Sequence, residues 1–166
     1  MADTINVNEY SIDTGLIDAT NACLDYLCKI TGYQRNNGAF IGDRLGDEIA
    51  NAFAFLISGG PDQAQNRQCP RPGKRYLADA QLIGQYKDLG QLYKVCGAMM
   101  NALPAYEDDK NDDSTVPSRG IRPNVGMFEI TDHPVIFSRI VSIGEKEITL
   151  WMLLMRFRVE YNNNKA

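Results

Sequence analysis

The fold is decided by residues 147–161, whose sequence is EITLWMLLMRFRVEY. Between Ile148 and Met155 apolar side chains point to both faces of an extended chain, which is typical of a strand covered on both sides. From Met155 onward the pattern alternates: Met155, Phe157, Val159 and Tyr161 fall on one face, and Arg156, Arg158 and Glu160 fall on the other. The stretch therefore predicts a long strand that is buried at one end and half exposed at the other.

Four more segments are predicted to form strands. The turn Gly144-Glu145-Lys146 leads into the long strand, and Asp132-His133-Pro134 interrupts the chain before it. The alanine-rich run that stops at Gly59-Gly60-Pro61 is compatible with a helix, but its alternating Phe53, Phe55 and Ile57 favour a strand. The predicted segments are Glu48–Ser58, Arg75–Lys87, Val125–Thr131 and Val135–Ile143.

Two helices are predicted from apolar residues at helical spacing. The first runs from about Thr14 to Thr31, with Asp13 or Thr14 as its cap and Gly32 at its end. The second follows Asp88, a good N-cap, and stops before Pro104. Their expected buried stripes are Leu16, Ile17, Thr20, Cys23, Leu24, Leu27 and Cys28 in the first helix, and Leu89, Leu92, Tyr93, Cys96, Met99, Met100 and Leu103 in the second.

The order of these elements predicts an α+β fold. We expect one antiparallel sheet of four to five strands, with two helices packed on one face and long loops between the strands. A chain of 166 residues is long enough for one core, so residues 1–166 are expected to form a single domain. Flexible loops are expected near residues 61–74 and 105–124, together with short mobile termini.

Composition excludes several function classes. The net charge is −4, and the stretch Glu107–Asp113 alone carries five acids and one base. The rest of the chain is neutral overall, which argues against a dedicated nucleic-acid-binding surface. The longest apolar run, Ile148 to Met155, is too short to span a membrane, and the N-terminus has no signal pattern. We therefore expect neither sequence-specific nucleic acid binding nor a membrane association.

The four cysteines predict neither a metal site nor a disulfide framework. Cys23 and Cys28 are five positions apart, which matches no usual zinc spacing, and His133 is the only histidine. Cys23 and Cys96 fall on apolar helical faces and are expected in the core. Cys69 lies in a polar loop, where an exposed thiol is expected. A chain without disulfides suits a reducing cytoplasm, and no cofactor is expected.

His133 is the obvious catalytic candidate, because Asp132 is beside it and a general base needs such a partner. However, Asp-His-Pro is also ordinary turn chemistry, since proline keeps the preceding residue extended. No nucleophile elbow, phosphate-binding loop or zinc-protease motif is present. We therefore expect no enzyme. The alternative is a small enzyme or ligand-binding domain with His133 and a pocket near Tyr76, Tyr86 and Tyr93.

Two polar loops of opposite charge are the better candidates for function. Loops of about 14 and 20 residues are longer than most connections in a compact domain. Their charges favour contact with each other, within one molecule or between copies. The acidic loop lacks the spacing of a calcium-binding loop. The candidate protein-interaction residues are Arg67, Arg71 and Lys74 in the first loop, and Asp108, Asp109, Asp112 and Asp113 in the second.

The order of elements from Gly15 to Tyr161 resembles the tail terminator (tail-completion, minor tail) proteins of long-tailed bacteriophages. The segment Phe53-Ala54-Phe55-Leu56-Ile57-Ser58-Gly59 is similar to that family's first long strand, which leads into an extended loop. The segment Thr149–Val159 is similar to its closing strand. The loop 105–124 is longer than in that pattern.

The resemblance implies a non-enzymatic virion protein, assembled in the host cytoplasm, that forms a hexameric ring. Such a ring caps the tail tube, stops its polymerisation and provides the head-tail joining surface. The implied partners are further copies of the chain, the tail tube protein, and neck or connector proteins. Two alternatives stay open: another neck or head-completion protein of the same virion, and a monomeric adaptor that binds a peptide at an exposed strand edge.

Overall fold

The computed structural model describes residues 14–59, 62–63, 75–107, 120–121 and 125–162, and contains the two predicted helices. Helix α2 spans Thr14–Thr31 and helix α3 spans Leu89–Ala102. The predicted cap of α3 is confirmed, because the Asp88 side chain accepts a hydrogen bond of 2.9 Å from the backbone N–H of Gly90. Gly32 ends α2 with φ of 79°, the left-handed conformation that glycine adopts without strain.

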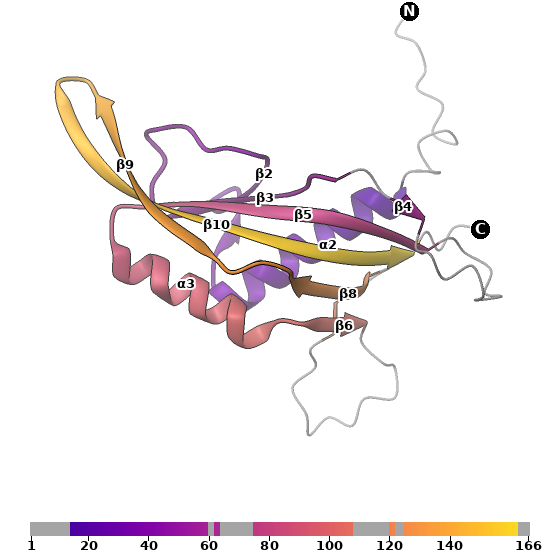
Figure 1. The fold of residues 1–166 in the computed structure, drawn as a ribbon. Helices are drawn as coiled ribbons and strands as arrows, with labels where there is room; N and C mark the ends of the chain where they lie inside the picture. The colour runs from indigo at the N-terminus through magenta and orange to yellow at the C-terminus, as the bar shows by residue number, and fades with distance from the viewer. Residues whose placement is uncertain (1–13, 60–61, 64–74, 108–119, 122–124, 163–166) are drawn as a thin grey trace, which may run out of the picture.

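The described strands form one sheet with the order β1-β2-β3-β5-β10-β8-β6-β7, while β4 adds to β5 and β9 adds to β10. Both helices pack on the same face of this sheet (Figure 1). The strands are β1 (Gln34–Arg35), β2 (Gly38–Ile41), β3 (Ala52–Ile57), β4 (Asp62–Gln63), β5 (Arg75–Tyr86), β6 (Ala105–Glu107), β7 (Gly120–Ile121), β8 (Val125–Ile130), β9 (Val135–Ile143) and β10 (Lys146–Asn162).

The expected antiparallel sheet of four to five strands is wrong. The described residues form a ten-stranded mixed sheet, in which β1–β2, β2–β3 and β6–β7 pair in parallel. The missed strands have only two to four residues, too few for an alternating pattern to be recognised. One of them, β2, contains the short apolar piece Ala39-Phe40-Ile41. Strands β4, β6 and β7 lie within the segments that were expected to be loops.

The prediction of a strand in the alanine-rich run is confirmed, although β3 begins at Ala52 rather than at Glu48. Asn51 has φ of 57°, outside the range of extended backbone, so the strand starts only after it. The other three predicted strands correspond to β5, β8 and β9, and the last strand is β10.

The core lies between the helices and one face of the sheet. The predicted alternation is confirmed in β10, where Met155, Phe157, Val159 and Tyr161 are buried, whereas Arg156 and Arg158 are exposed. Phe128 packs against Phe157 and Phe55, with ring centroids 5.0 and 5.7 Å apart. Cys23 and Cys96 are buried, as predicted.

The predicted helical stripes are partly wrong at their margins. Ile17, Tyr93 and Met100 are each more than half exposed, and Val95 is buried instead. The packing face of α3 is formed by Leu92, Val95, Cys96 and Met99. Apolar residues at the margins of a helical stripe point partly away from the sheet, so the sheet buries the centre of the stripe and leaves the margins exposed.

Strand β10 is much longer than the helices that cover the sheet. Its 17 residues extend about 55 Å, whereas the 18 residues of α2 and the 14 residues of α3 extend about 27 and 21 Å. The helices therefore cover only part of β10. The hairpin of β9 and β10 projects beyond them (Figure 1).

We predict that Gly84→Ala destabilises the protein by about 1–3 kcal/mol. A Cβ at Gly84 would lie 2.6 Å from Cε2 of Tyr86, so the fully buried ring or the strand would have to shift. The matched control is Gly97→Ala in α3, where a Cβ meets nothing within 4 Å and helix propensity favours alanine. Denaturant titration checks both variants, and equal stabilities for the two would contradict the close approach at Gly84.

We predict that unfolding becomes easier above about pH 9, partly because burial raises the pKa of the Cys23 thiol. The unfolded chain then releases a proton that the folded chain keeps, so stability is lost as pH rises, by up to about 1.4 kcal/mol per pH unit. Cys23→Ala is expected to give a shallower decline between pH 9 and 11 than the unsubstituted chain. Chemical unfolding at several pH values measures the slopes, and identical slopes would contradict the prediction.

Candidate assembly surface

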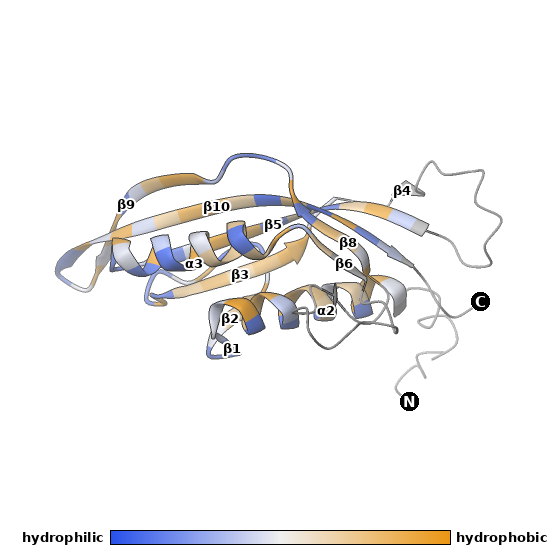
Figure 2. Cartoon of the chain, turned by 90° about the horizontal axis from the view of Figure 1, so that it is seen from below, coloured by the Kyte–Doolittle hydropathy of each residue, from blue (hydrophilic) through white to orange (hydrophobic). Residues whose placement is uncertain are grey.

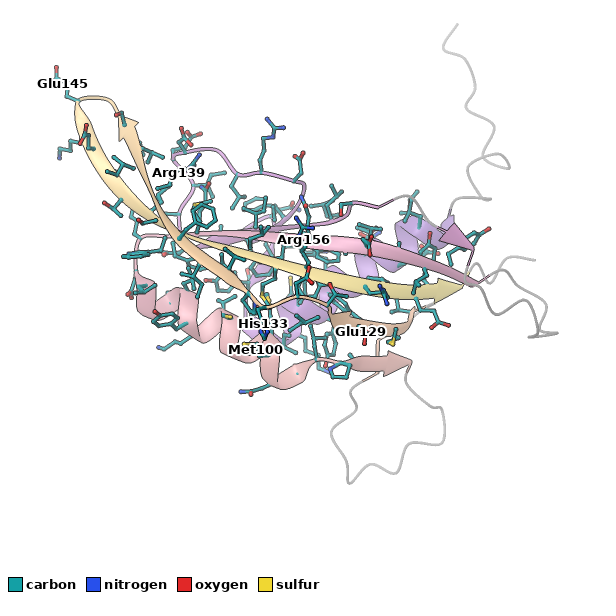
Figure 3. All side chains as sticks on the ribbon, viewed as in Figure 1. Met100, Glu129, His133, Arg139, Glu145 and Arg156 are labelled. Atoms are coloured by element: carbon teal, nitrogen blue, oxygen red, sulfur yellow. The ribbon has the colours of Figure 1, made fainter. Side chains whose placement is uncertain are left out.

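The projecting hairpin consists of β9 and the first part of β10, and is called the arm (residues 135–150). Strand β9 pairs with β10 along its whole length, from Val135 opposite Leu154 to Ile143 opposite Lys146. Strand β5 ends at Tyr86, opposite Trp151, so residues 146–150 pair with β9 alone among the described strands. Gly144, with φ of 65°, permits the tight turn at the tip beside Glu145 (Figure 3).

The arm carries most of the exposed large apolar side chains in the described part of the chain. Five of the nine lie on β9. Ile140 is 67% exposed, Val135 50% and Phe137 45%. Figure 2 colours much of β9 as hydrophobic. Within the described residues, the edge of β9 away from β10 pairs with no strand. An open edge with apolar side chains is a place where another chain binds.

A polar network at Arg139 fixes the arm to the rest of the molecule, called the body. The part of the arm around Arg139 is called its root. Arg139 Nη2 donates to Asp47 Oδ1 at 2.8 Å and to Gln85 Oε1 at 3.1 Å. The Gln85 side chain is buried, and its Nε2 donates to the backbone carbonyls of Gly46 and Ile49. Each hydrogen-bonding group of the buried amide is therefore used, which holds the connection between β2 and β3 against the arm.

A small second core supports the same root on the face of the sheet away from the helices. Val141, Leu150 and Met152 are buried there. Ala50 from the connection and Ile83 from β5 pack against them. On the opposite face of β9 the neighbouring Ile140 is 67% exposed, and Ile143 beside the turn is exposed as well.

The same outer face becomes polar farther along β10. A hollow of about 380 Å³ is lined there by Asp79, Gln81, Thr131, Asp132, Arg156 and Arg158, among others. Arg158 lies directly opposite Asp79 on one neighbouring strand and opposite Glu129 on the other. Opposite charges at such positions stabilise a sheet. This arrangement matches the solvated face that the alternation in β10 predicts.

His133 is exposed just before the start of β9, beside Met100 (Figure 3). The two residues line a shallow hollow of about 370 Å³ with Ile130 and Pro134. Among the described residues, no hydrogen bond or ion pair joins His133 to Asp132, and no group of three potential metal ligands is formed. Within the described ranges, His133 therefore has no hydrogen-bonded partner of the kind that a general base needs.

The pocket expected near Tyr76, Tyr86 and Tyr93 is wrong. Tyr76 and Tyr86 lie at opposite ends of β5, about 33 Å apart along the strand. Tyr76 stacks on Tyr161, Tyr86 is fully buried, and Tyr93 is 56% exposed on α3. These three side chains therefore cannot line one site.

The charged candidates Arg67, Arg71, Lys74, Asp108, Asp109, Asp112 and Asp113 lie outside the described residues, as does Cys69. The arm is not among the functional candidates that the sequence suggests, although Val135–Ile143 is predicted as a strand. The available signal was Val135-Ile136-Phe137, which is apolar on both faces. No helix in the described ranges is both long and apolar enough to cross a membrane.

We predict that Arg139→Ala loosens the arm without unfolding the body. The substitution leaves the buried Oε1 of Gln85 without its donor, at a cost of about 1–3 kcal/mol. Hydrogen exchange of the β9 amides is expected to become faster, while exchange between β5 and β10 stays unchanged. The control is Arg44→Ala, because Arg44 is highly exposed and pairs with the neighbouring Asp43. Unchanged exchange in β9 would mean that the apolar cluster alone holds the root.

Comparison with known proteins gives a similarity to solved structures only. No family model matches the chain, and no curated protein matches it. Among solved structures, a chain from the virion of a native gene transfer agent (GTA) particle is similar, with 15% sequence identity over 92% of this chain and 98% of that chain. The TM-score is 0.43. A similarity at this level assigns no function by itself.

Proposed function

We propose that this chain is a non-enzymatic structural protein of a phage virion, which forms a ring on the end of the tail tube. The observation that carries the proposal is the arm, with five exposed large apolar side chains on β9, whose outer edge pairs with no described strand. The resemblance of the sequence to tail terminator proteins supplies the type of assembly.

An exposed apolar edge is costly for a protein that stays alone. Soluble proteins normally protect edge strands with charges, proline or short length, because an open edge pairs with other chains. The nine residues of β9 include Arg139 as their one charged residue, and its side chain bonds to the body. A ribbon of two strands is also only marginally stable in water. Both constraints are relieved when another chain covers the arm.

The proposed mechanism is geometric. A ring closes when each copy contacts the next through two different surfaces and the rotation between copies closes. A hexameric ring seated on the tube covers its growing end, stops polymerisation, and presents its other side to neck or connector proteins. The loops around Arg67, Arg71 and Lys74, and around Asp108, Asp109, Asp112 and Asp113, supply complementary charges for docking. Assembly takes place in the host cytoplasm.

A different station in the same virion, as a neck or head-completion protein, agrees with the same features. A second function is favoured by the open edge of β9, namely a monomeric adaptor that binds an extended peptide through backbone hydrogen bonds. The two functions differ in self-association, because an adaptor stays a monomer at every concentration.

The test is native mass over a wide concentration range, with electron microscopy of any large species. We expect a closed ring with a mass of about six times the 18.5 kDa chain. Ile140→Glu introduces a charge at the most exposed apolar position of the arm, and is expected to weaken association at least about tenfold, which corresponds to 1.4 kcal/mol. Its thermal stability as a monomer is expected to stay close to that of the unsubstituted chain.

The matched control is Ile17→Glu, which changes an apolar residue of similar exposure, 51%, on α2. This variant should form rings normally. Equal association of the two variants would separate ring formation from the arm, and a strict monomer at all concentrations would favour the adaptor.

A further inference from the structure

Two rows of paired residues cross the sheet from β9 at one edge to β2 at the other. One row begins with Val135, which pairs with Leu154 of β10. Leu154 pairs with Ile83 of β5, Ile83 pairs with Ala54 of β3, and Ala54 pairs with Phe40 of β2. The first two residues of β9 and residues 39–40 of β2 thus lie at the same level on opposite edges of one sheet.

The edge at β2 is also partly open. Strand β1 pairs only with Gly38 and Ala39, so no described strand lies beside Phe40 and Ile41 on that side. Ile41 is 52% exposed, and a hollow of about 200 Å³ lies beside it. The hollow is lined by Leu24, Arg35, Asn36, Ala39, Phe40 and Ile41.

The exposed apolar side chains of the described strands are confined to these two edges. Six large apolar residues on strands are exposed: Ile41 on β2, and Val135, Ile136, Phe137, Ile140 and Ile143 on β9. The other three, Ile17, Tyr93 and Met100, lie on the helices. Ile41 lies one residue beyond the row that joins Val135 to Phe40, so exposed apolar residues occur on both edges near that level. Such exposure is what a chain needs if one edge binds the other edge of its neighbour.

The strand directions permit this contact. Strand β9 is antiparallel to β10, β10 to β5, and β5 to β3, whereas β3 is parallel to β2. It follows that β9 and β2 of one chain run in opposite directions. If the sheet of one copy continues into the next with the same orientation, β9 lies antiparallel to the neighbour's β2, the arrangement with the better hydrogen bonds.

We infer that the β9 edge of one copy docks on the β2 edge of a second copy, so that the sheet continues from subunit to subunit. The inference rests on the proposed function, because it names the contact that closes the ring. The contact joins two different surfaces, as a ring requires, and leaves each copy with one free edge until closure. A two-fold contact between two β9 strands would stop at a dimer, and would leave Ile41 exposed.

The experiment uses the full chain with Val135→Cys and Ile41→Cys, singly and combined, and a short thiol-specific cross-linker. The combined variant is expected to give a ladder of covalent oligomers on a denaturing gel. On the same gel, each single variant should run as a covalent monomer. An equal mixture of the two single variants should give covalent dimers and nothing larger. The unsubstituted chain controls for its own four cysteines. Native mass and microscopy of the same samples report ring formation.

The outcomes separate the contact from the function. Covalent dimers of the Val135→Cys single variant would mean that β9 pairs with β9, which overturns the inference. Rings without a ladder from the combined variant would also overturn it, while the proposed function stands. A ladder without closed rings supports the contact and contradicts the ring. Monomers with neither ladder nor ring overturn both.

Discussion

The structure depends on the length of β10. Its C-terminal half lies between β5 and β8 and carries the core residues that face both helices, while its N-terminal part pairs with β9. Beyond the end of β5, residues 146–150 of β10 pair with β9 alone among the described strands. The arm is therefore a direct result of one strand being longer than the layer of helices that covers it.

Long elements with a clear period could be predicted from the sequence. The bounds of α2, the cap at Asp88 and the alternation from Met155 to Tyr161 all follow from local patterns that the structure keeps. The short strands β1, β4 and β7 have two residues each, and their pairing is set by contacts with distant segments. Parallel pairing of β2 with β3 likewise depends on how the connection 42–51 folds back over the sheet, which local patterns do not encode.

The candidate site was harder to predict than the fold. Val135–Ile143 has the composition of a buried strand, and composition cannot show that nothing covers it. Its exposure depends on other segments: no described strand pairs with its outer edge, and the distal part of the hairpin projects beyond the helices. His133 is the catalytic candidate by residue type, yet its described surroundings are those of a turn. Exposure, rather than residue type, identifies the surface here.

The connection between β2 and β3 links the two edges of the sheet within one molecule. It starts directly after Ile41, and its Gly46, Asp47 and Ile49 hold the side chains of Gln85 and Arg139 at the root of the arm. The open edge at β2 and the position of β9 are therefore linked through one short segment of the chain. In the proposed ring, this link would let a copy that is docked at β2 hold its arm in place for the next copy, which would make assembly cooperative. A pool of subunits would then contain free chains and complete assemblies, with few partial ones between them.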